Sequence, residues 1–243
     1  MTYCVGLKLD RGLVFAADTR TNAGVDNIAT FKKLHVWEKP GDRVITLMSS
    51  GNLAITQAVV SILSEHINAS SSDRPTLMNV DTMFQAARLV GSAIREVRAI
   101  DGEALQANAD NFYVTLILGG QIKGEEPRLF QIYSAGNFIE ATDDTRFLQI
   151  GEHKYGKPIL DRVTRRDMRL GEGAKMILLS FDSTLRSNLS VGMPIDLLLY
   201  NTDSYSAERQ LRISQDDPYF QKLSAGWSKS LRDAFVNMDE LEV

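Results

Sequence analysis

The chain has 243 residues, of which 44% are hydrophobic and 24% charged, so it has enough apolar material for one substantial core. Its net charge of -4 gives no electrostatic reason to expect nucleic acid or an anionic membrane as a partner. The single cysteine, Cys4, excludes an internal disulfide framework and a zinc site built on several cysteines. No signal-peptide pattern and no membrane-length apolar run is present, so we expect a cytoplasmic protein.

The chain begins with the pattern of a β-hairpin. Apolar residues alternate with others from Tyr3 to Leu9, and a turn signal follows at Asp10 to Gly12. A second apolar run then covers Leu13 to Ala17. In a hairpin with so short a turn, Thr2 lies opposite the residues just after Asp18, so Asp18 is expected beside the start of the chain.

Strands and helices then follow in groups. The strands come in groups before and after pairs of helices, an order that differs from the alternating strands and helices of βαβ units. This order favours antiparallel sheets with helices packed outside them. We therefore expect one α+β domain over residues 1–243. The expected later elements are strands at 34–37 and 43–48, helices at 52–67 and around 83–97, strands at 111–118 and 128–133 and near 138 and 147–150, helices at 157–166 and around 174–185, a strand at 195–200, and a helical C-terminal extension from about 217.

The residue after the initiator methionine is the first candidate for chemistry. Thr2 is small enough to allow removal of Met1 by a methionine aminopeptidase, which would leave a hydroxyl and a free α-amine on one residue. Such an amine has a pKa of about 7.7–8, so part of it is neutral near pH 7 and accepts a proton from a hydroxyl. Taken alone, however, threonine is also a common second residue without any special role.

Two charged positions extend this candidate. Asp18 follows an apolar run, and a partly buried carboxylate there needs a cation or several hydrogen-bond donors. Lys33 precedes another apolar segment and supplies such a cation if its side chain points inward. A lysine between Asp18 and Thr2 would stabilise an alkoxide and keep the amine unprotonated, because like charges disfavour each other. In the alternative arrangement, Asp18 pairs with Arg20 and the lysine is a solvated residue at the end of a strand.

Together these features resemble the active β-subunits of proteasomes, which are N-terminal-nucleophile (Ntn) hydrolases. The stretches that carry the resemblance are Thr2 to Leu7, Val14 to Arg20 and Lys32 to Leu34. On this resemblance, Thr2, Asp18 and Lys33 correspond to the nucleophile, the carboxylate and the lysine of the family. It also implies a four-layer αββα sandwich, with two antiparallel sheets between helix layers, and amide or peptide hydrolysis through an acyl-enzyme on Thr2.

Within that superfamily the chain is most similar to Anbu, the bacterial ancestral β-subunit. The long second helix, the segment Gly151 to Lys157 and the aromatic C-terminal extension favour Anbu over the heat-shock peptidase that works with an unfoldase ATPase. This resemblance implies self-assembly into an open, spiral-like particle and operon partners of the ATP-grasp and transglutaminase-like kinds. No cofactor and no metal are expected.

Four supporting candidates lie where the family has further site residues. Glu152 stands near the serine of a Gly-Ser-Gly turn, and Asn188 and Ser190 occupy the region of an Asp-x-x-Ser-Gly motif. Asn188 still donates and accepts hydrogen bonds but brings no negative charge. Gly51 lies a few positions later than the glycine whose N–H group contributes to the oxyanion hole.

These departures from the family pattern keep two alternatives open. The first is a catalytically weak or silent assembly scaffold that binds a partner, and the second is a non-peptide amidase or amidotransferase of the same superfamily. Cys4 falls on the same strand face as Thr2 and is an alternative nucleophile, although a small buried hydrophobe is the commoner role. The three histidines have no metal-ligand spacing with nearby acids.

Overall fold

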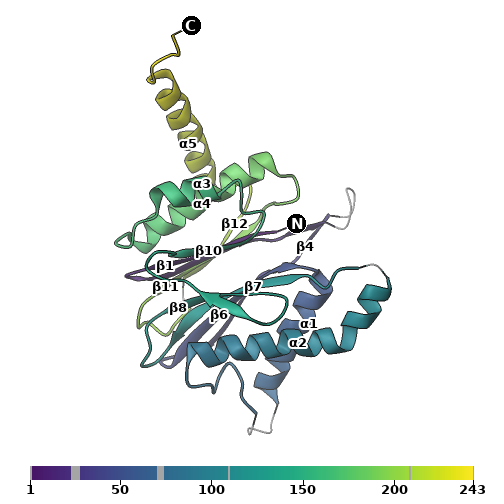
Figure 1. Cartoon of the computed structure of the whole chain (residues 1–243). Helices are drawn as coiled ribbons and strands as arrows, with labels where there is room; N and C mark the ends of the chain where they lie inside the picture. Colours follow the sequence, from purple (N-terminus) through teal and green to yellow (C-terminus); the bar gives the residue numbers. More distant parts are fainter. Residues whose placement is uncertain (1, 23–27, 70–73, 109, 208, 243) are drawn as a thin grey trace.

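The computed structural model describes residues 2–22, 28–69, 74–108, 110–207 and 209–242. Two five-stranded antiparallel sheets lie face to face, and helices cover the outer face of each sheet (Figure 1). The expected α+β class and four-layer αββα sandwich are therefore confirmed.

The first sheet contains the start of the chain, with its strands in the order β10-β1-β2-β11-β12. These strands are β1 (Tyr3–Leu9), β2 (Gly12–Asp18), β10 (Phe147–Gly151), β11 (Ile195–Asn201) and β12 (Arg209–Ile213). Strands β1 and β2 form the predicted hairpin, in which Cys4 pairs with Ala17 and Leu9 with Gly12. Gly12 has a φ of 140°, and a Cβ there would lie 1.9 Å from the carbonyl oxygen of Tyr200, so the turn requires glycine.

The second sheet has the order β5-β6-β7-β8-β9. Its strands are β5 (Leu34–Lys39), β6 (Arg43–Gly51), β7 (Val114–Ile122), β8 (Arg128–Ile132) and β9 (Phe138–Glu140), and a separate pair is formed by β3 (Arg20–Asn22) and β4 (Ile28–Thr30). The long central pair β6–β7 runs from Arg43 opposite Ile122 at one end to Gly51 opposite Val114 at the other.

Helices form the two outer layers. They are α1 (Leu53–Asn68), α2 (Met83–Ala107), α3 (Lys157–Val163), α4 (Leu170–Ser187) and α5 (Pro218–Val236). Helices α1 and α2 cover the second sheet, α3 and α4 cover the first, and α5 projects from the α3–α4 layer away from the sandwich (Figure 1). None of the helices in the described part of the chain combines the length and apolarity that crossing a membrane requires.

Three apolar clusters of buried residues lie between the layers. Successive side chains of a strand point to opposite faces, so each sheet contributes to a cluster on both of its faces. Leu7 and Phe181 belong to the cluster between the first sheet and its helices. Phe15 and Met48 meet in the cluster between the two sheets, and Val90 of α2 belongs to the cluster under α1 and α2. Alternation along β1 therefore sends Tyr3 toward the helices and Cys4 toward the second sheet.

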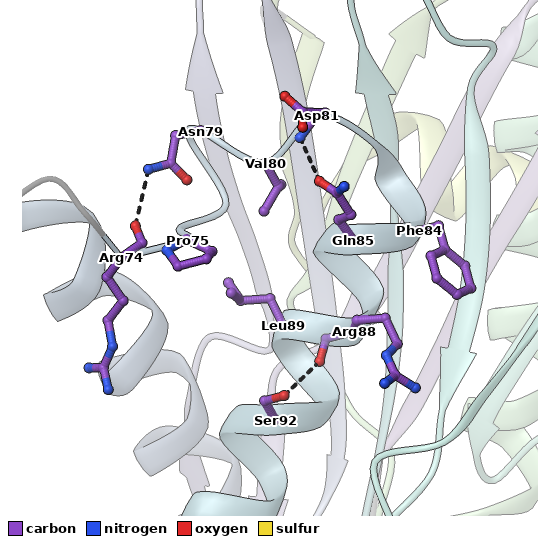
Figure 2. A pocket seen from close by; sticks show the side chains of 10 residues that line it. All are labelled: Arg74, Pro75, Asn79, Val80, Asp81, Phe84, Gln85, Arg88, Leu89 and Ser92. Atoms are coloured by element: carbon purple, nitrogen blue, oxygen red, sulfur yellow. Dashed lines mark hydrogen bonds between the residues drawn. The ribbon is translucent and has the colours of Figure 1, made fainter.

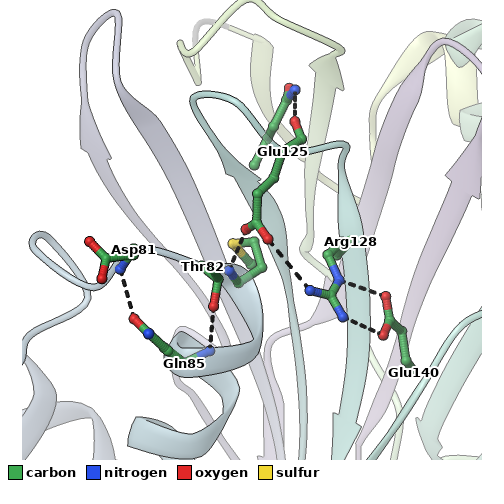
Figure 3. Close-up of polar contacts among 8 residues, drawn as sticks. Asp81, Thr82, Gln85, Glu125, Arg128 and Glu140 are labelled. Carbon is green, nitrogen blue, oxygen red and sulfur yellow. Dashed lines mark hydrogen bonds and ion pairs between the residues drawn. The ribbon is translucent and has the colours of Figure 1, made fainter.

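The N-terminus of α2 is held by a carboxylate from the turn between β7 and β8 (Figure 3). Glu125 Oε2 accepts the N–H group of Met83 at 2.6 Å, and Thr82 Oγ1 accepts the N–H group of Gln85 at 3.1 Å. Arg128 lies 3.6 Å from Glu125 and pairs with Glu140 through two hydrogen bonds. A negative charge at this position also stabilises the helix dipole.

We expect Glu125→Ala to destabilise the protein by about 1–2 kcal/mol, because it leaves a partly buried N–H group of α2 without its acceptor. The free energy of unfolding from urea denaturation measures this loss. Glu126→Ala, which changes the exposed neighbouring residue, is the matched control and should stay within about 0.5 kcal/mol of the parent protein. Equal effects of the two variants would contradict the capping role.

Candidate active site

The hairpin register brings the start of the chain against Asp18. The N–H group of Tyr3, the residue bonded to Thr2, donates to Asp18 Oδ1 at 3.0 Å. Thr2 is 7% exposed and Asp18 is fully buried. By alternation with Cys4, Thr2 falls on the face of the strand that looks toward the second sheet. The hydroxyl residue therefore lies where the two sheets meet at the Gly51 end of the second sheet.

Lys33 completes a buried ion pair at this point. Its Nζ donates to Asp18 Oδ1 at 2.7 Å and to the carbonyl oxygen of Arg20, and the residue is only 4% exposed. The backbone is fixed as well, because the N–H group of Ser49 donates to the Lys33 carbonyl at 3.1 Å. The lysine thus points inward and contacts Asp18, whereas the alternative pair of Asp18 with the Arg20 side chain does not form among the described contacts.

Asp18 is surrounded by donors. Its second oxygen, Oδ2, accepts the N–H group of Gly192 at 3.2 Å, so the carboxyl group receives hydrogen bonds from two backbone N–H groups and one ammonium. Burial raises the pKa of Asp18, while the charge of Lys33 and the three donors act in the opposite direction. Because all three groups donate hydrogen bonds, they stabilise the ionised form of the Asp18 carboxyl group.

The segment after α4 supplies one of these donors through a glycine. A Cβ at Gly192 would lie 2.1 Å from Nε of Arg20, so only glycine lets the guanidinium lie against this backbone. Arg20 Nη1 also donates to the carbonyl oxygen of Leu189 at 2.9 Å. The sequence-based candidates in this segment bond to each other, because Asn188 Oδ1 accepts the N–H group of Ser190 at 2.9 Å, and neither is among the described hydrogen-bond partners of Asp18. The contact with Asp18 belongs to Gly192, which the sequence analysis did not single out.

Glu152 contacts the candidate nucleophile through its backbone. Its N–H group donates to the carbonyl oxygen of Thr2 at 2.7 Å. The preceding Gly151 has a φ of 81°, and a Cβ there would lie 1.8 Å from the same carbonyl oxygen. The turn after β10 thus requires glycine in order to approach Thr2 so closely.

Gly51 and Ser50 end the strand that faces Thr2 across the sandwich. Gly51 has a φ of 118°, and a Cβ there would lie 2.3 Å from the carbonyl oxygen of Tyr113, so this glycine serves the close approach of β6 and β7. Ser50 is 6% exposed, and its Oγ lies 3.3 Å from the Cβ position at Gly151. Sequence reasoning missed Ser50, although its alternation with Met48 along β6 places it on the face toward the first sheet.

Cys4 is unsuited to act as the nucleophile. The residue is fully buried, and its Sγ lies 3.8 Å from the carbonyl oxygen of Ser49. Burial raises the pKa of the Cys4 thiol well above its ordinary value, so the reactive thiolate is disfavoured. Cys4 is therefore part of the core between the sheets.

A separate groove follows the first turns of α2 (Figure 2), and it lies at the other end of the second sheet. Its lining includes Val80, whose carbonyl oxygen accepts a hydrogen bond from Arg43 Nη1 at 2.7 Å. Arg43 begins β6, whereas Thr2 lies near Gly51 at the end of that strand. This groove is consequently not part of the Thr2 site.

Comparison with known proteins agrees with this geometry. The model of the family described as "Proteasome subunit" matches residues 2–198. Proteasome subunit beta 2 of Nitrosopumilus maritimus (strain SCM1) is 24% identical over 210 residues, which are 84% of this chain and 88% of that protein. The chain belongs to the proteasome subunit family.

Solved structures that are similar to this chain include several Anbu proteins. A Gly-1 mutant of Anbu from Hyphomicrobium sp. strain MC1 is 62% identical, with a TM-score of 0.92 and all of both chains covered. Anbu from Yersinia bercovieri is 50% identical with a TM-score of 0.93, again over all of both chains. The helical assembly of the Anbu complex from Pseudomonas aeruginosa contains a chain that is 46% identical, with a TM-score of 0.94 over 99% of this chain and 98% of that one. The expected resemblance to Anbu is confirmed.

Proposed function

We propose that the protein is a threonine-type Ntn hydrolase that cleaves amide or peptide bonds through an acyl-enzyme on Thr2. The observation that carries this proposal is the buried pair of Asp18 and Lys33 held against the peptide group that joins Thr2 to Tyr3. An ion pair removed from water costs desolvation free energy, so its position beside an N-terminal hydroxyl residue suggests a chemical use. Met1, whose removal the proposal requires, lies outside the described residues.

The proposed reaction uses the two functional groups of Thr2 together. Its free α-amine, directly or through a water molecule, takes the hydroxyl proton while the Thr2 oxygen attacks the substrate carbonyl. The amine then gives the proton to the leaving nitrogen, the C–N bond breaks, and an ester remains on Thr2. Water hydrolyses this ester in a second step. Backbone N–H groups of the segment 48–51 are the proposed donors to the tetrahedral oxyanion.

Lys33 and Asp18 have electrostatic roles in this scheme. The ammonium of Lys33 stabilises the developing negative charge on the Thr2 oxygen and disfavours protonation of the nearby amine. Asp18 holds that ammonium charged and fixed in direction through the 2.7 Å contact. Incubation of the purified protein with a peptide β-lactone followed by intact-mass measurement tests the proposal. We expect one adduct per chain on Thr2.

A second candidate function, a silent assembly scaffold, is favoured by one specific observation. The family's serine and aspartate near the nucleophile have no side-chain counterpart in this geometry, because Glu152 acts through its backbone and Asn188 bonds to Ser190. A protein that has lost Met1 and forms its full assembly, yet remains unmodified by the β-lactone, would support the scaffold over the enzyme.

The Gly151 turn allows a sharp test of the site geometry. We expect Gly151→Ala to slow β-lactone labelling by on the order of 10²-fold, because a methyl group there would collide with the Thr2 carbonyl and displace the nucleophile. Gly171→Ala is the matched control, because no atom lies within 4 Å of a Cβ at that helical position. Similar labelling rates for both variants would contradict the proposed geometry.

Self-assembly is the second part of the proposed function. Helix α5 projects from the sandwich (Figure 1). Its last turns and the segment that follows it carry exposed apolar side chains. Phe235 is 79% exposed, Val236 77% and Met238 69%. Apolar side chains at such density are typical of protein interfaces. We propose that α5 contacts other copies of the chain in a multi-subunit, cytoplasmic particle.

We expect Phe235→Asp to shift the protein to a smaller assembly, because it places a charge in the proposed contact. Size-exclusion chromatography with light scattering measures the mass at several protein concentrations. Gln57→Asp, on the exposed surface of α1, adds the same charge to a different layer and should leave the mass unchanged. If the mass of the Phe235 variant is unchanged, α5 is not part of the interface between copies of the chain.

A further inference from the structure

A second pocket opens beside Thr2 on the side of strand β10. It has a volume of about 380 Å³ and lies between β10 and the neighbouring ends of β7 and β8. Gly151 lines it and pairs with Tyr3 in the first sheet. The next residue, Glu152, donates its N–H group to the Thr2 carbonyl at 2.7 Å. The wall of the pocket and the candidate nucleophile are thus connected by a direct backbone contact.

The described residues that line this pocket offer both polar and apolar surface, but no carboxylate, ammonium or guanidinium. Among the described residues that line it there is no Asp, Glu, Lys or Arg. The polar side chains that line it are those of Tyr113, Thr115, Gln131, Tyr133, Ser134, Gln149 and His153. Gln149 Nε2 donates to the Tyr3 hydroxyl at 2.6 Å, which fixes the orientation of its amide. The pocket therefore offers hydrogen bonds from hydroxyl and carboxamide groups.

Several of these groups have unused hydrogen-bonding capacity. Thr115 is 7% exposed, and its side chain makes no hydrogen bond to any residue in the described ranges. The same holds for Gln131, and for Ser50, which pairs with Thr115 across β6 and β7. Alternation places Thr115 on the face of Ile117, toward the first sheet. Neither Thr115 nor Gln131 has a buried polar atom that lacks a partner, so their unbonded polar atoms are accessible, and both residues line the pocket. These two side chains can therefore form hydrogen bonds with a ligand that enters it.

We propose that this pocket binds a neutral, hydrogen-bonding side chain of the substrate next to the bond that Thr2 cleaves, with a carboxamide as the chemical class. A carboxamide has both a donor and an acceptor, which match the amide of Gln131 and the hydroxyl of Thr115. A carboxylate or an ammonium would lose its hydration without gaining a countercharge, so charged side chains are selected against. The assignment of the ligand as a substrate depends on the proposed function of Thr2.

Binding of two nearly isosteric probes tests the pocket without requiring catalysis. The probes are N-acetyl-glutamine methylamide and N-acetyl-glutamate methylamide, titrated into the assembled Thr2→Ala protein and followed by NMR. We expect the amide probe to bind about tenfold more tightly than the acid, a difference of ~1.4 kcal/mol. Equal affinities, or no binding of the amide probe up to about 100 mM, would overturn the proposal.

Variants assign the binding to this pocket. Gln131→Leu keeps the size of the side chain but removes its amide, and it should reduce the affinity for the amide probe about tenfold. Gln85→Leu in the groove on α2 is the matched control and should leave the affinity unchanged. Unchanged affinity of the Gln131 variant, at an unchanged melting temperature, would show that the probe binds elsewhere and would refute the pocket.

The outcomes separate this proposal from that of the Thr2 nucleophile. Selective amide binding together with no β-lactone adduct on the parent protein would retain the pocket and exclude the hydrolase. A β-lactone adduct on Thr2 without amide selectivity would retain the hydrolase and exclude the carboxamide pocket.

Discussion

Lys33→Met is expected to lose nearly all reactivity of Thr2 and to destabilise the protein by about 3–5 kcal/mol. The variant leaves the carboxylate of Asp18 fully buried without its cation, and an uncompensated buried charge is among the most costly changes to a folded protein. Loss of the ammonium also removes the charge that stabilises the alkoxide of Thr2. Urea denaturation measures the stability, and the rate of β-lactone labelling measures the reactivity.

The neighbouring lysine provides the control for that experiment. Lys32 is exposed, so Lys32→Met should change the stability by no more than about 0.5 kcal/mol and should leave labelling unchanged. The double variant Asp18→Asn with Lys33→Met removes both charges and should recover part of the lost stability without recovering labelling. A single Lys33 variant as stable and as reactive as the Lys32 variant would contradict the role of the buried pair.

Thr2→Ala is expected to abolish labelling, by at least about 10³-fold, with little change in the free energy of unfolding. Thr2→Ser keeps a hydroxyl and an α-amine on one residue and should retain measurable labelling. A glycine inserted between Met1 and Thr2 keeps the hydroxyl but moves the free amine one residue away. This third protein separates the role of the amine from that of the hydroxyl.

We expect the glycine insertion to reduce labelling nearly as much as Thr2→Ala, because the proposed general base is then absent. The pair of Asp18 and Lys33 should remain intact in this protein, so its stability should match that of the parent chain. Full labelling of the inserted protein would show that another group accepts the hydroxyl proton and that the α-amine is dispensable.

Much of the fold was predictable from local pattern. The alternation from Tyr3 to Leu9 and the turn at Gly12 gave the hairpin, and its register placed Asp18 beside the chain start. The helical stripe beginning at Met83 gave α2, and Asn52 lies at the predicted start of α1, where it caps the helix. These elements could be predicted from the sequence because each has a regular spacing of apolar residues or a recognisable turn or cap residue. The four-layer arrangement itself came from the resemblance to the proteasome family.

The unpredicted strands lack such patterns. Strand β12 has only one buried residue, Ile213, so no alternation marks it, and β3 and β4 are only three residues long. The predicted strand at 111–118 begins at Val114 and continues to Ile122, through two consecutive glycines at 119 and 120 that no strand pattern favours. They lie inside β7, where a Cβ at Gly119 would lie 2.7 Å from the ring of Phe15.

The charged residues of the candidate site could be predicted from the sequence, but the backbone contacts around them could not. Asp18 follows an apolar run and Lys33 precedes one, and the two residues form the ion pair that fits the resemblance to the family. The role of Gly192 depends on a distant loop approaching Asp18, and that of Gly151 depends on a turn approaching Thr2. Such contacts join residues far apart in the chain through groups common to all residues, so no local pattern reveals them.

The central claim is that Thr2 has a free α-amine and acts as the nucleophile. A peptide α′,β′-epoxyketone tests both parts at once, because it forms a ring only with a hydroxyl and an amine on the same terminal residue. Peptide mapping by mass spectrometry should find the parent chain without Met1 and with the probe joined to both groups of Thr2. A chain that retains Met1, or a correctly processed and assembled chain that carries no adduct on this residue, would contradict the claim.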